Sequence, residues 1–178
     1  MSNPRKKQKK VYSFDTSAFL ALSRTDEKVI KLDEAVWDHL KKMMENGSLI
    51  SHYIVYDEII SGAKNPPQIV KWIENNKKYF LSKTDTQRVQ VPDIVRRFPG
   101  LIDPAREKEQ ADPWLIALAV EKSKDENLFE VCVCIVVSQE NPNSSKKIPA
   151  ACKAFKIEHL SLRQFFDEIG LGTKLSKK

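Results

Sequence analysis

Four carboxylates stand at the ends of predicted structural elements, and their chemistry suits a metal ion. They are Asp15, Glu58, Asp112 and Glu140. Carboxylates that share one pocket repel one another and hold protons more tightly unless a cation joins them. Oxygen ligands without His or Cys favour Mg²⁺ or Mn²⁺ over zinc. Such an ion activates a bound water and supports an in-line displacement at phosphorus, so the pattern predicts a metal-dependent hydrolase.

Each acid also has an ordinary structural interpretation. Asp15 can cap the helix that follows it or form an Asx-turn, and Asp112 before Pro113 fits a helix N-cap. Glu58, within a predicted helix, and Glu140, in a polar stretch, fit solvated surface groups. Periodicity alone does not bring the four acids together, so both interpretations stay open.

Strand and helix signals alternate along the chain. Short apolar or β-branched runs predict strands at 11–14, 48–51, 131–137 and 156–160. Helical spacing, caps and stops predict helices at 17–23, 30–45, 65–80, 112–120, 148–155 and 161–169. One further helix is predicted around Glu58, ending at Gly62. Segment 82–105 contains three prolines and is predicted as a short helix plus a surface loop.

This alternation predicts an α/β fold with a mainly parallel sheet. Parallel strands end at one edge of a sheet, so Asp15 and Glu140 should share that edge. Residues 114–120 are apolar on every side and predict a buried helix packed on the sheet, and Asp112 stands at the start of that helix.

Length and charge set the outline of the molecule. The 178 residues predict one domain over 11–170. The net charge of +6 comes from basic tails at 1–10 and 171–178, which hold five and three positive residues and leave residues 11–173 at −2. Such tails can hold phosphate backbones or keep the ends soluble.

Several classes of protein do not fit the sequence. There is no apolar run long enough for a membrane span and no apolar segment of a secretory signal, so a cytoplasmic protein is expected. The three cysteines are interpreted as small buried hydrophobic residues rather than a disulfide or zinc framework. No glycine-rich phosphate loop is present, which argues against a nucleotide-binding domain.

Five stretches of the sequence resemble a known family. They are Tyr12–Ala18, Asp57–Ile59, Ala111–Ala119, Val136–Glu140 and Lys147–Cys152. In this order they resemble the PIN-domain superfamily, and specifically the bacterial PIN-like family DUF4411. The resemblance implies a three-layer α/β/α sandwich, an acidic pocket for Mg²⁺ or Mn²⁺, and cleavage of single-stranded RNA. It also implies that the protein is plausibly the toxin of a toxin–antitoxin pair, with an antitoxin protein as partner and a possible homodimer.

The same resemblance implies roles for individual residues. Asp15, Glu58 and Asp112 take the places of the first three acids. The fourth acid usually follows a Thr-x-Asp pattern, which is Ser138-Gln139-Glu140 here, so Glu140 is the candidate, with a longer side chain. Thr16 and Ser138 are expected to orient the carboxylates by hydrogen bonds.

Two functional hypotheses follow. The first is a Mg²⁺- or Mn²⁺-dependent endoribonuclease in which Asp15, Glu58, Asp112 and Glu140 are both metal ligands and catalytic groups. The second is a catalytically inactive PIN-like module that binds RNA or a protein partner. RNA cleavage by the protein and by its Asp15→Asn and Asp112→Asn variants discriminates between them.

Overall fold

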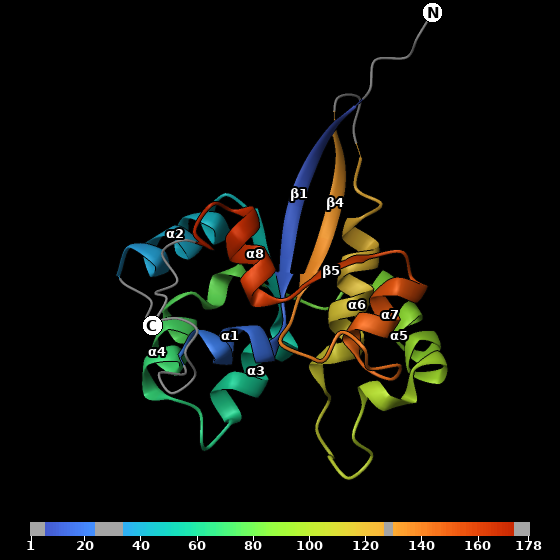
Figure 1. Cartoon of the computed structure of the whole chain (residues 1–178). Helices are drawn as coiled ribbons and strands as arrows, with labels where there is room; N and C mark the ends of the chain where they lie inside the picture. Colours follow the sequence, from blue (N-terminus) through green and yellow to red (C-terminus); the bar gives the residue numbers. More distant parts are fainter. Residues whose placement is uncertain (1–5, 24–33, 127–129, 173–178) are drawn as a thin grey trace, which may run out of the picture.

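One five-stranded sheet forms the centre of the molecule. The computed structural model describes residues 6–23, 34–126 and 130–172. Its strand order is β3-β2-β1-β4-β5, and every neighbouring pair is parallel (Figure 1). The strands are β1 Lys7–Phe14, β2 Leu49–His52, β3 Phe80–Leu81, β4 Glu130–Val137 and β5 Glu158–Leu160. All carboxyl ends therefore lie at one edge, as the sequence predicts.

Helices cover both faces of this sheet. They are α1 Thr16–Leu22, α2 Glu34–Glu45, α3 Tyr53–Ser61, α4 Pro67–Asn75, α5 Asp85–Arg97, α6 Ala111–Lys122, α7 Ile148–Ala154 and α8 Leu162–Glu168. Helices α5, α6 and α7 lie on one side and the others on the opposite side (Figure 1). Short 3₁₀ turns occupy Lys77–Tyr79 and Pro99–Leu101. The predicted α/β fold with its parallel sheet is confirmed, and the layers are consistent with a PIN-like sandwich.

The core follows from the apolar runs in the sequence. Helix α6 is buried from Pro113 to Ala119 because it packs between the sheet and the helices α5 and α7. On the opposite face, Phe165 of α8 packs edge-on against Tyr12 and Phe14 of β1. The carboxyl-terminal halves of β1 and β4 are buried throughout, which fixes the positions of the residues that follow them.

Strand β1 begins earlier than the sequence predicts. It starts at Lys7 rather than residue 11, and residues 7–10 pair with residues 130–133 of β4. These four residues are exposed, so their polar side chains conceal the strand from an analysis of apolar pattern. Residues 7–10 of the predicted basic tail 1–10 are therefore strand, and they project with β4 beyond the other strands (Figure 1). Residues 1–5 and 173–178 of the predicted tails, and 30–33 of the predicted helix 30–45, lie outside the described residues.

The prediction for segment 82–105, a short helix plus a loop, is confirmed in outline, but the helix is longer than predicted. Residues 85–97 form the continuous helix α5, with Pro92 inside it. A capping box of Thr84 and Gln87 begins the helix, and Gln87 and Ile94 are buried. Tertiary contacts with α6 offset the lost backbone hydrogen bond at the proline.

The predicted helix 65–80 is also corrected. Helix α4 ends at Asn75, and Phe80–Leu81 form the short strand β3, which pairs with Ser51 and His52. Asn65 does not cap α4, because its side-chain amide donates to the Ile59 carbonyl at 2.8 Å.

Other local signals behave as predicted. Gly47 ends α2 with a φ of 72°, a conformation that favours glycine. Ser161 and Gln164 form the predicted capping box of α8. Among the helices of the described residues, none has the length and apolar content needed to cross a membrane.

Candidate active site

Asp15 is a buried carboxylate with one unused oxygen. It follows the last residue of β1 and is 3% exposed. Its Oδ2 caps α1 by accepting hydrogen bonds from the Ser17 backbone N–H at 3.0 Å and the Ser17 hydroxyl at 2.5 Å. Its Oδ1 is buried without a hydrogen-bond partner. The capping interpretation therefore accounts for one oxygen, and the other is available to a cation.

Glu58 joins three elements from within α3. Its Oε2 accepts a hydrogen bond from the Thr16 hydroxyl at 2.5 Å. Its Oε1 accepts from the backbone N–H of Ala111, the first residue of α6, at 2.9 Å. Helix α6 has no side-chain cap of its own, so Glu58 supplies one from another element and complements the helix dipole. Glu58 is therefore neither a free surface group nor a group committed only to a metal.

Asp112 lies in the first turn of α6 and does not cap it. The N-cap position belongs to Gln110, which corrects the capping interpretation of Asp112. The side chain of Asp112 is partly buried. Within the part of the chain that the structure describes, this side chain makes no hydrogen bond or ion pair, so its carboxylate is not tied to the protein framework.

Glu140 resembles Glu58 in its contacts. It lies three positions beyond the end of β4, and its Oε2 accepts from the backbone N–H of Ile148, the first residue of α7, at 2.7 Å. Helix α7 likewise has no side-chain cap of its own. The Ser138 hydroxyl accepts from the Glu140 backbone N–H at 3.3 Å and bonds to His159 Nε2 at 2.9 Å. Ser138 thus positions the backbone of Glu140 rather than its carboxylate.

The four acids lie within electrostatic range of one another. The pKa of Asp15 is raised to about 6, mainly by burial; the Ser17 hydrogen bonds oppose this rise, and the charges of Glu140 and Glu58 add to it. Burial likewise raises the pKa of Asp112 to about 8, aided by the charges of Asp15, Glu140 and Glu58 and opposed by Lys147. A strongly perturbed pair of carboxyl groups at a strand edge is typical of functional sites.

A family model covers almost the whole of this architecture. It is DUF4411, described as a domain of unknown function, and it matches residues 12–172. The chain belongs to the DUF4411 family. No curated protein and no solved structure matches the chain. The match contains all four acids, but the description of the family assigns no activity to them.

The oxygen donors of this DUF4411 domain fit a hard divalent cation, but they do not form a closed cage. Within residues 6–23, 34–126 and 130–172, no group of three His, Cys, Asp or Glu side chains is arranged to hold a metal ion. Mg²⁺ commonly keeps several waters and uses only one or two carboxylates. The unpartnered Oδ1 of Asp15 and the raised pKa of Asp112 match that requirement, because a cation stabilises both groups in their charged form.

A groove opens beside Glu58, one of the four acids of the DUF4411 domain. It has a volume of about 950 Å³ and runs between α3 and the loop that precedes α6. Its polar lining is mixed in charge, since Arg106 and Lys108 alternate with Glu107 and Glu109 along the loop. Of the four candidate acids, Glu58 is the one that lines it, so the groove gives an extended ligand access to that residue.

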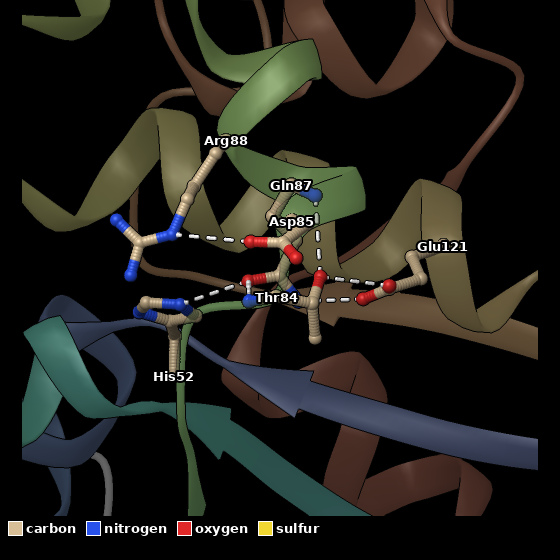
Figure 2. Close-up of polar contacts among 6 residues, drawn as sticks. All are labelled: His52, Thr84, Asp85, Gln87, Arg88 and Glu121. Carbon is tan, nitrogen blue, oxygen red and sulfur yellow. Dashed lines mark hydrogen bonds and ion pairs between the residues drawn. The ribbon is translucent and has the colours of Figure 1, made fainter.

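A network of hydrogen bonds joins the elements around the site. His52 ends β2 and is fully buried; its Nδ1 accepts from the Ile54 N–H at 3.1 Å, and its Nε2 bonds to Gln87 Oε1 at 3.2 Å. Gln87 and Thr84 both donate to Glu121 of α6, at 2.6 and 2.8 Å (Figure 2). Burial lowers the pKa of His52 to about 4, so the ring is neutral near pH 7 and Nε2 carries the proton. The network connects β2, α5 and α6, the helix that begins next to Asp112.

Sequence reasoning located some polar partners and missed others. The expectation that Thr16 orients a carboxylate is confirmed by its bond to Glu58. The role of Ser17 was missed, although an Asp-x-Ser sequence at a helix start signals this kind of capping. Lys147, the cation that acts on Asp112, was also missed. It belongs to a polar loop, and sequence alone gives no sign that the loop returns to the acids.

Proposed function

We propose that this DUF4411 protein is a Mg²⁺- or Mn²⁺-dependent endoribonuclease of PIN type that cleaves single-stranded RNA. The observation that supports it most is the pair Asp15 and Asp112, whose pKa values are both raised at the carboxyl edge of a parallel sheet. Without a cation, holding these carboxylates ionised costs free energy, and a structural role alone does not explain that cost. The sequence resemblance to PIN domains supports the same conclusion.

In this proposal, each acid has a defined part. Asp15 and Asp112 hold the ion directly, and Glu58 and Glu140 complete its negative surroundings while they cap α6 and α7. The ion, when bound, lowers the pKa of a water and supports in-line attack on the phosphate. Thr16 and Ser17 fix the carboxylates of Glu58 and Asp15, so these oxygens stay in place during the reaction.

The groove provides the path for the substrate. In this proposal an RNA strand lies between α3 and the loop that precedes α6, where Thr16 and Glu58 line the groove together with Arg106 and Lys108. Basic side chains along such a path contact the backbone without reading its sequence.

The test is cleavage of a labelled single-stranded RNA in the presence of Mn²⁺. Loss of a group that merely supports a metal site typically costs about 10–100-fold in activity, so Asp15→Asn and Asp112→Asn should each lose at least about 100-fold. Chelation of the metal should abolish wild-type cleavage. As a control, Asp38→Asn changes an exposed acid of α2 that does not line the groove and should cleave normally. Equal cleavage by wild type, Asp15→Asn and Asp112→Asn would disprove the enzymatic function.

A second candidate function is a non-catalytic module that binds RNA or a protein partner. The observation that favours it is the use of both glutamates as helix caps, since that role explains them without chemistry. This candidate predicts RNA binding or partner capture without any metal-dependent cleavage.

The proposal extends to a toxin with an antitoxin protein as partner. Expression of the wild type without that partner should arrest bacterial growth, and expression of Asp15→Asn should not. Normal growth with both proteins would remove the toxin role and leave the nuclease activity to be decided by the cleavage assay. Light scattering of the purified protein tests the proposed homodimer.

A further inference from the structure

The backbone of Lys147 is held firmly next to the acids. Lys147 precedes Ile148, whose N–H donates to Glu140 at 2.7 Å. Its own carbonyl accepts from the N–H groups of Ala150 and Ala151, at 3.0 and 3.2 Å. The start of α7 therefore fixes Lys147 on one side, and the carboxylate of a proposed site residue lies one position away.

Lys146, the residue before Lys147, packs closely against Gly100. Gly100, in the 3₁₀ turn after α5, lies so close to Lys146 that a Cβ there would be 2.8 Å from the Lys146 carbonyl oxygen and Cβ. This close approach seats the loop against the body of the protein. Lys146 thus faces Gly100, while Lys147 begins the helix capped by Glu140.

The side chain of Lys147 is a cation without a partner. It is exposed, and within the described residues it makes no hydrogen bond or ion pair, although Glu140 binds the N–H of the next residue. Its charge reaches Asp112, whose negative charge it stabilises. Arg106, which lines the groove, is instead held by Asp103 at 3.7 Å. Lys147 is therefore free to turn toward a ligand at the acids.

We propose that the Lys147 ammonium contacts a non-bridging oxygen of the phosphate that is cleaved, a role that rests on the proposed ribonuclease function. A phosphodiester at the acids is negatively charged, and its charge shifts further onto the phosphoryl oxygens during displacement. A compact ammonium that reaches these oxygens from a fixed backbone position stabilises that charge. Lys147 forms no covalent bond and transfers no proton in this role.

The test compares two neighbouring lysines. Lys147→Met removes the proposed contact, and Lys146→Met removes an equal charge one residue away while keeping the Cβ against Gly100. Loss of one donor to a developing oxyanion costs about 10²–10³-fold in kcat. We expect a loss of that size for Lys147→Met, partial recovery for Lys147→Arg, and a change below about threefold for Lys146→Met. Thermal melting of each variant verifies that it is folded.

A binding measurement separates this contact from the chemistry. In the Asp15→Asn background, fluorescence anisotropy with a labelled single-stranded RNA gives the affinity at several salt concentrations. Removing one phosphate contact should lower the slope of log affinity against log salt by about 0.7 for Lys147→Met. Lys146→Met should leave the slope unchanged.

The outcomes distinguish failure of this inference from failure of the proposed function. If the wild type cleaves RNA and Lys147→Met cleaves it equally well, the role of Lys147 is disproved and the nuclease stands. If Lys146→Met and Lys147→Met lose the same amount of RNA cleavage activity, the effect comes from the general positive charge of this loop. The specific contact of Lys147 is then disproved. If the wild type does not cleave RNA, both proposals fail.

Discussion

Glu58 and Glu140 show how one carboxylate can belong to a fold and to a site at once. Each accepts a hydrogen bond from the first N–H of a helix that lacks its own cap. A substitution at either position therefore changes helix stability as well as any metal site. The choice of substituent decides which effect is observed.

Glu58→Ala and Glu58→Gln should separate these effects. The amide of Gln keeps an oxygen that accepts from the Ala111 N–H, whereas Ala removes the cap. Loss of a helix cap costs about 0.5–2 kcal/mol, so Glu58→Ala should lower the free energy of unfolding by about 1–2 kcal/mol and Glu58→Gln by less than half of that. Urea denaturation without metal measures both. Both variants should lose RNA cleavage if Glu58 belongs to the metal site.

Glu140 provides the matching comparison at α7. Glu140→Ala and Glu140→Gln should show the same order of stability, because Glu140 accepts from Ile148 in the same way. Equal destabilisation by Ala and Gln at both positions would contradict the capping role.

At the scale of elements, α5 is the helix that local sequence argues against most. It contains Pro92, which removes a backbone donor in the helix interior. Its start is fixed by Gln87, which is fully buried and bonds at once to His52, Thr84 and Glu121 (Figure 2). Tertiary hydrogen bonds at the first turn thus position a helix that the proline weakens.

Gln87→Met should therefore be costly although it keeps the size of the side chain. It leaves the His52 N–H and part of the Glu121 carboxylate without partners, and unsatisfied buried groups of this kind cost about 2–3 kcal/mol in all. Urea denaturation should show a loss of that size.

The adjacent Arg88 is the matched control for that measurement. It pairs with Asp85 at 3.8 Å on the exposed side of the same turn, and exposed ion pairs contribute about 0–1 kcal/mol. Arg88→Met should therefore change the free energy of unfolding by less than about 1 kcal/mol. If Gln87→Met and Arg88→Met lower the free energy of unfolding equally, the hydrogen bonds of Gln87 are not what stabilises α5.

At the scale of the whole molecule, the raised pKa of Asp112 makes stability depend on pH. The folded state holds a proton on Asp112 up to about pH 8, whereas an unfolded aspartate releases it near its ordinary pKa of 3.8. Because the folded state binds the proton more tightly, the free energy of unfolding should fall as pH rises from about 4 to 8. The loss should be at least about 1.4 kcal/mol, the equivalent of one pKa unit.

Denaturation across this pH range, with and without Mg²⁺, checks that expectation. Asp112→Asn cannot ionise, so its stability should change less with pH. Mg²⁺ should raise the stability of the wild type most near pH 8, because a ligand of the folded state stabilises it. A wild type that is as stable at pH 8 as at pH 5 without metal would contradict the pKa shift.

Much of this architecture could be predicted from sequence, because apolar patterns report burial. The β-branched run before Glu140 and the short run before Asp15 predicted parallel strands with both acids at one edge, although not that the two strands are neighbours. The exposed start of β1, the two-residue β3 and the full length of α5 were not predicted, because tertiary pairing rather than local pattern forms them. The capping of α6 by Glu58 was also beyond prediction, since it joins residues 53 positions apart. That the four acids bind metal stays a prediction.

The central position of β1 has a consequence for how the chain comes into existence. Its neighbour β4 lies near the other end of the sequence, and the Gln139 N–H reaches the Ser17 hydroxyl across 122 positions. Such high contact order slows folding, because a large loop must close before the contact forms. During synthesis on the ribosome, β1 cannot pair with β4 until residues 130–137 have emerged. The proposed metal site needs acids that follow both strands, so it would form only after β4 has left the ribosome.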